Sequence, residues 1–250
     1  MCIRDRHIAA SGNYNLFTTT NATYDPTLHV EDCTVDAAYN VVYDSHNTQN
    51  FQKIYFGNSI VKMTVANKPF YSTKAKDAHT QQLIRLDNNV FYAETPLQNY
   101  LINCGDRSQA FQTTRLQVEV TNNTIYNIYQ PNIMIRAYVL AGLTVTKNVG
   151  YYTGVTAKNY LTGVYDTAGF TADKAEVTYN YLYTAPVSDT NFWSAKHTGS
   201  YTPANNQMGD GVEAPFSSMD AAKGYFPVDA SVVKTGAGAT YDTKAWFKTE

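Results

Sequence analysis

Three charged side chains have the types and spacing to act on one ligand. Arg85 and Asp87 stand two residues apart in a run of β-strand character, and Glu119 lies in the next such run at the place that corresponds to Arg85. Side chains two residues apart on a strand point to the same face. Carboxylates bind Ca²⁺ and an arginine pairs with an acidic sugar, so Asp87 and Glu119 are candidate calcium ligands. The simpler interpretation, which we favour, is a surface salt bridge between Arg85 and Glu119.

A second group of side chains could hold a ligand without reacting with it. Four tyrosines each follow an asparagine of a repeat by three residues: Tyr92, Tyr126, Tyr151 and Tyr183. The residue before each tyrosine is mostly apolar and is expected to point inward, so the tyrosines are expected to point outward in one row. Aromatic rings with a hydroxyl edge suit the faces of sugars, which makes this row a candidate carbohydrate-binding surface. The alternative, which we favour, is structural: the rings stack on one another or are covered by the chain after His197.

Other residues that bind metals or form covalent bonds have no useful spacing. The histidines at positions 29, 46, 79 and 197 are scattered, which argues against a zinc site. Cys33 and Cys104 fall at different places in the repeat and are expected to be buried free thiols. We therefore expect no cofactor, with Ca²⁺ as the one candidate ion.

A repeat of asparagines predicts the elements that position these side chains. Five of them end runs of strand character and are each followed by an apolar step: Asn58, Asn89, Asn123, Asn148 and Asn180. Cys33 occupies this place in an earlier, weaker copy, and neighbouring copies are 25 to 34 residues apart. Irregular intervals of this length are typical of a solenoid with loop insertions. Coils stacked about 4.8 Å apart would let the amides form a hydrogen-bonded ladder. Asparagines in unrelated turns are the alternative.

The period of two along a strand predicts which residues form the core. Apolar residues recur five and three residues before the repeated position: Leu28, Val30, Ile84, Leu86, Val118, Val120, Leu143 and Val145. They are expected to point inward, and Arg85, Asp87 and Glu119 to point outward. Before Asn58 the apolar pair is displaced to Ile54 and Phe56. This predicts a one-residue irregularity near Gly57.

The expected fold is all-β: a right-handed, single-stranded parallel β-helix of about six or more coils with an asparagine ladder and a non-repetitive C-terminal cap. Residues 7–27 are expected to be the remnant of a truncated coil, 28–197 the coils, and 198–250 a turn-rich capping segment that protects the last coil from edge pairing. Residues 1–6 read Met-Cys-Ile-Arg-Asp-Arg, which matches the translation of a sequencing adapter. We expect this stretch to be an adapter scar on a metagenomic fragment that has lost its signal sequence.

Composition excludes two classes of partner. The chain has 250 residues and a formal charge of −2, and its lysines and arginines form no cluster, which argues against a nucleic-acid-binding surface. No apolar run approaches the roughly eighteen residues that a transmembrane helix needs.

The segment Val-Thr-Asn-Asn-Thr-Ile-Tyr-Asn (120–127) and the ending Gly-Ala-Gly-Ala-Thr-Tyr-Asp-Thr-Lys-Ala-Trp (236–246) carry a resemblance to known proteins. The chain resembles the right-handed parallel β-helix superfamily of pectate lyases. It is most similar to uncharacterised pectate-lyase-like domains of bacterial surface lipoproteins encoded near polysaccharide-uptake systems. The resemblance implies an extracellular or cell-surface location and a polysaccharide or oligosaccharide partner.

The catalytic motifs of that superfamily do not occur in this sequence. Pectate lyases carry Trp-Ile-Asp-His and Arg-x-Pro-x-x-Arg elements, and neither is present. The motifs of polygalacturonases and pectin methylesterases do not occur either. The sequence thus favours a non-catalytic polysaccharide-binding or scaffold protein. The alternatives are a Ca²⁺-dependent polysaccharide lyase, with Arg85, Asp87 and Glu119 as its candidate catalytic residues, and a structural β-helix of the adhesin type.

Overall fold

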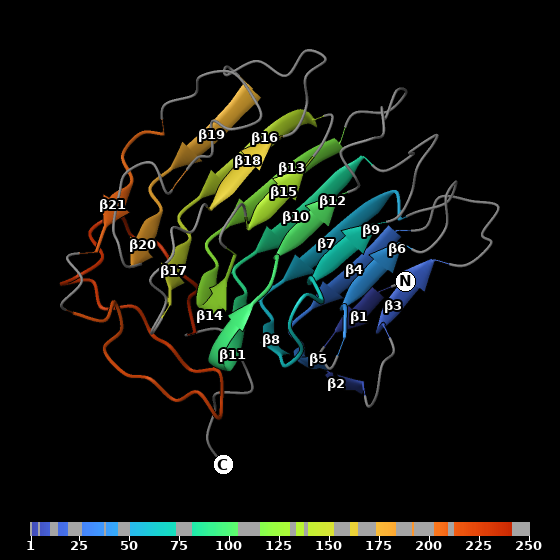
Figure 1. The fold of residues 1–250 in the computed structure, drawn as a ribbon, viewed down its shortest axis with the longest axis horizontal. Helices are drawn as coiled ribbons and strands as arrows, with labels where there is room; N and C mark the ends of the chain where they lie inside the picture. The colour runs from blue at the N-terminus through green and yellow to red at the C-terminus, as the bar shows by residue number, and fades with distance from the viewer. Residues whose placement is uncertain are drawn as a thin grey trace.

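The chain folds as a parallel β-solenoid, as predicted, with three sheets around one core (Figure 1). The computed structural model describes residues 2–4, 6–10, 15–19, 27–37, 39–44, 51–73, 82–104, 116–130, 134–137, 140–152, 161–164, 174–183, 192, 203–209 and 213–241. All strand pairs within the three sheets are parallel, and the described residues contain no α-helix. Each coil contributes one strand to each sheet in turn, which is the arrangement expected of a solenoid.

The three sheets are defined by the following strands. Sheet A contains β1 (Cys2–Arg4), β4 (Thr27–Glu31), β7 (Lys53–Gly57), β10 (Leu83–Asp87), β13 (Leu116–Thr121), β16 (Leu140–Thr146) and β19 (Ala175–Thr178). Sheet B contains β2 (His7–Ala10), β5 (Thr34–Ala37), β8 (Ile60–Met63), β11 (Val90–Gln98), β14 (Thr124–Tyr129), β17 (Val149–Tyr151), β20 (Tyr181–Tyr183) and β21 (Gln207–Met208). Sheet C contains β3 (Phe17–Thr19), β6 (Val42–Asp44), β9 (Tyr71–Thr73), β12 (Ile102–Cys104), β15 (Ile135–Ala137) and β18 (Thr162–Val164).

The number of fully enclosed coils is smaller than the six or more that the sequence predicts. In four coils, from β4 to β15, every strand has a paired neighbour on both sides. The coils at either end lie at the edge of at least one sheet. Strand β1 comes from the predicted adapter stretch and pairs with β4, and the origin of that stretch remains a prediction.

The core follows the predicted alternation. The eight apolar residues expected to point inward are all buried, with exposed fractions of 0 or 1%. Cys33 is buried and forms no disulfide, as predicted, and the side chain of Cys104 lies outside the described residues. The predicted irregularity near Gly57 is wrong, because β7 pairs with β10 in unbroken register, with Ile54 opposite Ile84 and Phe56 opposite Leu86. The residue that aligns with Asn89 is therefore Ser59, one position after Asn58.

A left-handed backbone conformation turns the chain from sheet A into sheet B. Seven residues of this corner have positive φ, between 48° and 57°: Asp32, Asn58, Asn88, Asn122, Lys147, Tyr179 and Asn205. Asparagine and aspartate tolerate this conformation better than other side-chain-bearing residues. We call these seven residues the corner row. Asn58 belongs to this row and not to the buried asparagine row that follows it.

The end of the chain covers the row of tyrosines on sheet B, as the favoured interpretation of that row predicts, and not the surface predicted for the cap. The C-terminal cap was expected to cover the last coil, but residues 213–241, here called the strap, pack on the outer face of sheet B. In Figure 1 the strap runs in orange and red along the side formed by β20, β17, β14 and β11. The edge of the last coil is instead extended by β21, which pairs with β20, and by a bridge between Thr178 and Ala204. Residues 242–246 lie outside the described part.

Candidate functional site

A buried row of amides forms the first corner of the solenoid. In Asn123, Asn148, Asn180 and Asn206, the side-chain oxygen accepts hydrogen bonds from the backbone N–H and the side-chain amide of the preceding coil's asparagine. The amide nitrogen of Asn123 also donates to the carbonyl of Leu86 at 3.0 Å. Asn89, Asn123, Asn148 and Asn180 are completely buried. The row satisfies the polar groups of each turn inside the stack, which buried amides require.

The row differs from its prediction at both ends. Ser59 stands where Asn58 was predicted: its hydroxyl accepts from the backbone of Cys33 at 3.1 Å and donates to the carbonyl of Gly57 at 2.7 Å. Asn206 extends the row by one coil and was missed. The pair Asn205–Asn206 resembles the earlier Asn-Asn pairs but lacks the apolar residues that flank them. Only the asparagine pair itself could have indicated this position.

The four predicted tyrosines form one row on the outer face of sheet B. Tyr92, Tyr126, Tyr151 and Tyr183 are aligned in register from β11 to β20. Their rings contact one another and the strap. The ring centroids of Tyr126 and Tyr151 are 5.5 Å apart, and those of Tyr151 and Tyr183 are 4.8 Å apart. The ring of Phe226 stacks on Tyr126 at 4.0 Å, and Phe216 meets Tyr151 edge-on at 5.5 Å.

Burial by the strap changes the chemistry of these rings. It raises the pKa of the Tyr92 hydroxyl to about 12 and also raises the pKa values of Tyr126 and Tyr151. Tyr92 and Tyr151 are buried, and Tyr126 and Tyr183 are partly buried. Carbohydrate binding by these tyrosines remains a prediction, and the ring faces described above already have partners within the protein.

Two glycines and three hydrogen bonds let the strap lie close to sheet B, and a fourth hydrogen bond lies within the strap. A Cβ atom on Gly224 would come within 2.7 Å of Ile60 and Tyr92, and one on Gly238 would lie 3.2 Å from Val149 on sheet B and 2.4 Å from Val228 in the strap itself. The backbone of the strap donates from Gly238 to the carbonyl of Lys147, from Ala239 to the Thr124 hydroxyl, from Thr240 to the Asn88 amide oxygen and from Phe226 to the Tyr241 hydroxyl. The strap is therefore a packed part of the domain and shares an apolar cluster with the outer face of sheet B.

The predicted charged residues come together on the outer face of sheet A. Arg85 and Glu119 lie opposite each other on β10 and β13 and form a salt bridge. The hydrogen bond that Arg85 donates to Glu119 within this salt bridge raises the pKa of the Arg85 guanidinium. The carboxylate of Asp87 accepts from the hydroxyl of Thr121 at 2.6 Å and from the amide of Asn122 at 3.0 Å. The arrangement matches the favoured interpretation, a surface salt bridge.

The same contacts bear on the calcium prediction. Glu119 also accepts from Gln117 at 2.7 Å, so both of its oxygens have protein donors. Within the described ranges, no group of three or more His, Cys, Asp or Glu side chains is placed to hold a metal ion. Both oxygens of Glu119 and Oδ1 of Asp87 thus accept hydrogen bonds from neighbouring side chains.

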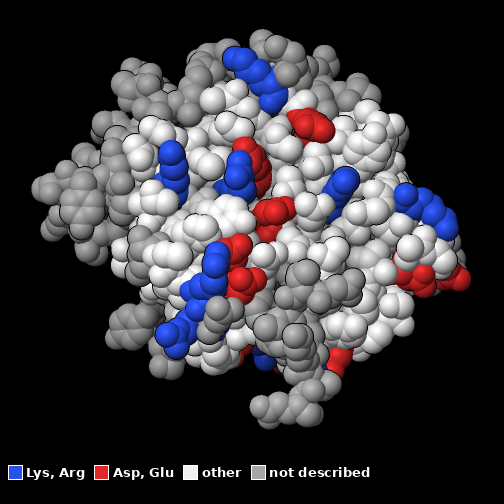
Figure 2. Space-filling view, turned by 180° about the vertical axis from the view of Figure 1, so that it is seen from behind, with Lys and Arg blue, Asp and Glu red and all other residues white. Residues whose placement is uncertain are grey.

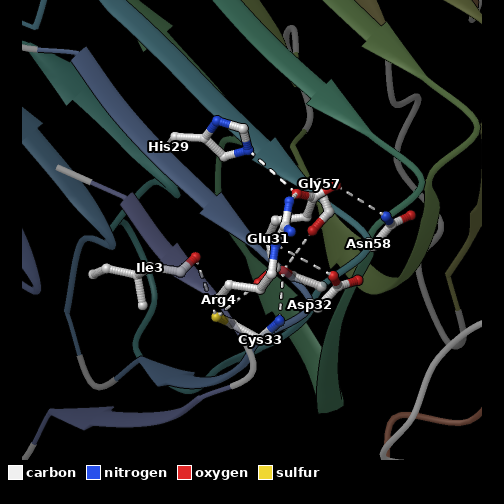
Figure 3. Close-up of polar contacts among 9 residues, drawn as sticks. Ile3, Arg4, His29, Glu31, Asp32, Cys33, Gly57 and Asn58 are labelled. Carbon is white, nitrogen blue, oxygen red and sulfur yellow. Dashed lines mark hydrogen bonds and ion pairs between the residues drawn. The ribbon is translucent and has the colours of Figure 1, made fainter.

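A cluster that the sequence analysis missed lies on the outer face of sheet A toward the N-terminus (Figure 3). His29 lies 3.4 Å from the carboxylate of Glu31 and meets the ring of Tyr55 edge-on, with 4.4 Å between ring centroids. Arg4 pairs with Glu31 and lies 3.9 Å from Asp32. Register alone could have found it, since His29, Tyr55 and Arg85 occupy the same place on β4, β7 and β10.

Figure 2 shows this side of the molecule, with basic and acidic side chains interspersed among uncharged surface. Most acidic groups in the view lie beside a basic one, as the ion pairs of Arg4 and Arg85 require. The face therefore offers paired charges, hydroxyls and rings to a ligand, and no extended field of one sign.

Comparison with known proteins gives no relative from which a function could be transferred. No family model matches the chain, and neither a curated protein nor a solved structure matches it significantly. Among the described residues, no helix is both long and apolar enough to cross a membrane.

Proposed function

We propose that the protein is a non-catalytic carbohydrate-binding or scaffold β-solenoid that presents the outer face of sheet A to an extended polysaccharide. One observation supports this most directly. The outward side chains of sheet A remain partly or fully exposed along five successive strands from β7 to β19, whereas the corresponding central part of sheet B is covered by the strap.

The chemistry of this face suits a sugar chain. Tyr55 and His29 provide aromatic surface, and aromatic rings stack on the apolar faces of sugars. Arg85, Gln117 and Thr144 provide hydrogen-bonding groups on neighbouring strands. Strands repeat about every 4.8 Å, so these groups form a regular array along the solenoid that an extended polymer could follow.

The contacts of the candidate catalytic residues support binding without catalysis. A lyase needs a base with access to the substrate, and a general base must reach the proton that it removes. Arg85 and Glu119 neutralise each other, and Asp87 is held by Thr121 and Asn122. A Ca²⁺-dependent lyase and an adhesin-type structural protein are the other functions that the sequence leaves open.

The proposal includes an extracellular or cell-surface location, because that is where the protein would encounter an extended polysaccharide. It also includes a role beside polysaccharide-degrading enzymes and membership of the pectate-lyase-like superfamily. The motivation for that membership is the solenoid together with the resemblance at residues 120–127 and 236–246.

Affinity gel electrophoresis against a panel of acidic and neutral polysaccharides tests the proposal. The double variant Tyr55→Ala, Arg85→Ala removes the ring and the cation from sheet A. The matched control Lys62→Ala, Glu94→Ala removes an exposed ion pair from sheet B. We expect the first variant to bind at least about tenfold more weakly, a loss of about 1.4 kcal/mol, and the control to bind as wild type does.

Two outcomes would contradict the proposal. One is wild-type protein that is retained by no polysaccharide in the panel, and the other is a sheet A variant that binds as strongly as wild type. New ultraviolet absorbance from unsaturated uronides, with Ca²⁺ supplied, would replace the proposal by the lyase alternative. Thermal melts of both variants show that any loss of binding is not a loss of fold.

A further inference from the structure

The corner row changes its character toward the C-terminal end of the solenoid. Its first four members are partly buried, and the amides of three of them bond to the preceding coil: Asn58 to Glu31, Asn88 to Asn58, and Asn122 to Asp87. The next two members are Lys147 and Tyr179, and both are exposed. These are the only two positions of the seven-membered row that hold neither asparagine nor aspartate.

The backbone at these two positions is strained for the residues that occupy it. Lys147 has a φ of 56° and Tyr179 a φ of 57°. A left-handed conformation is unusual for a bulky residue, whereas asparagine adopts it more easily. Strain of this kind persists where the surrounding structure fixes the backbone, and it concentrates at functional sites.

The side chain of Tyr179 contributes little burial in return for that strain. It is 44% exposed, whereas Tyr181, two residues later, is completely buried. Asparagine would meet the needs of the backbone better, as it does in the neighbouring coils. An exposed tyrosine in this conformation is therefore explained more readily by contact with a ligand than by folding.

The two side chains belong to adjacent coils with a fixed spacing. The backbone N–H of Lys147 donates to the carbonyl of Thr178 at 3.2 Å, so the two turns stack one coil apart, about 4.8 Å. The strap fixes the Lys147 turn from the other side, since Gly238 donates to its carbonyl at 2.8 Å. An exposed tyrosine and an exposed lysine thus occupy adjacent turns of the corner that borders the outer face of sheet A.

We propose that Tyr179 and Lys147 form a subsite for an anionic sugar unit, with the ring against the apolar face of the sugar and the ammonium group against its carboxylate or sulfate. Tyrosine combines apolar stacking with a polar edge, and lysine acts as a compact point charge. This inference rests on the proposed function, because it names the class of polysaccharide that the surface binds.

The variants Tyr179→Asn and Lys147→Asn test the subsite in a way that separates it from stability. Each installs the residue that the corner prefers, so each variant should melt at the same temperature as wild type or higher. We expect each to bind at least about tenfold more weakly to the anionic polymer that wild type retains. Met219→Ala, which removes an exposed apolar side chain from the strap, is the control and should change neither property.

Polygalacturonate, dextran sulfate and unmodified dextran are the probes, measured by affinity electrophoresis. If the asparagine variants lose binding to polygalacturonate, the ligand is a carboxylated sugar. If they lose binding to dextran sulfate, it is a sulfated one. If wild type binds an anionic polymer and either asparagine variant binds it equally strongly, the subsite is overturned and the proposed function stands. Retention of wild type by dextran alone also overturns it, and retention by no polysaccharide overturns both proposals.

Discussion

Replacing Asn123 by alanine tests whether the buried amide row holds the coils together. The Asn123 side chain is completely buried and takes part in four hydrogen bonds: it accepts two from Asn89, at 2.9 and 3.1 Å, and donates to Leu86 and to Asn148, both at 3.0 Å. A typical hydrogen bond contributes a net of about 1 kcal/mol, and groups left buried without partners cost more. We expect Asn123→Ala to lower the free energy of unfolding by about 4 kcal/mol.

Two variants of the same solenoid calibrate this value. Asn206→Ala removes three hydrogen bonds at a partly exposed end of the row, where water can replace them, so the loss should be about 1 to 2 kcal/mol. Asn58→Gly keeps the left-handed turn but removes an amide that lies outside the buried row, and it should cost less than about 1 kcal/mol.

Urea unfolding followed by circular dichroism measures all three changes, with the midpoint and slope reported separately. The reasoning is refuted if Asn123→Ala costs no more than Asn206→Ala, because burial would then have no effect on the bonds of the row. It is equally refuted if Asn58→Gly is as damaging as Asn123→Ala, since Asn58 would then belong to the row.

Three further results are expected. Gly238→Ala should lower the melting temperature more than Gly236→Ala, because both have positive φ but only Gly238 has close neighbours, Val228 of the strap at 2.4 Å and Val149 of sheet B at 3.2 Å. Equal losses would contradict the close packing around Gly238. In an ultraviolet titration of the wild-type protein, the Tyr92 phenol should ionise near pH 12, and this step should be missing in the variant Tyr92→Phe. Because the pKa of Tyr92 is raised in the folded state, its contribution to stability should be complete below pH 10 and fall between pH 10 and 12. Ionisation of Tyr92 near pH 10 would show that the ring is not buried. Arg85→Ala should change the free energy of unfolding by less than about 1 kcal/mol, as for other exposed ion pairs, and a loss above about 2 kcal/mol would contradict that view.

The solenoid could be predicted because its core has a local signature. Residues such as Val118 and Val120 alternate with polar neighbours and recur in every coil, so period and interval together identify the stacking direction. Ser59 was missed because a serine hydroxyl can fill the place of an asparagine: it accepts from the backbone of Cys33 in the preceding coil and donates to Gly57 in its own turn. Asn58, the residue before Ser59, was therefore assigned to the buried row, although its role is to adopt the positive φ of the corner.

The strap could be predicted only in part. Sheet B has paired apolar residues where alternation would place one polar residue, as in Ile60–Val61 and Val90–Phe91, and strands of that kind are buried on both faces. This local signal indicates that something covers the sheet. The chain after His197 was named as one candidate cover, but its position depends on contacts across more than 100 residues, such as Ala239 to Thr124, which no local pattern encodes.

The outer faces of sheets A and B differ because of what their strands place outward. On sheet B, the outward residues aligned from Ile60 to Tyr181 are apolar except for Thr124, and the strap covers them. Toward the N-terminus, Thr34, Asp36 and Lys62 take the outward places. On sheet A the corresponding positions hold Arg85, Glu119 and Thr144, whose polar groups would lose their hydration beneath an apolar segment. The outward residues thus determine that the strap covers sheet B. Sheet A, with the corner of Lys147 and Tyr179 beside it, stays accessible to a ligand.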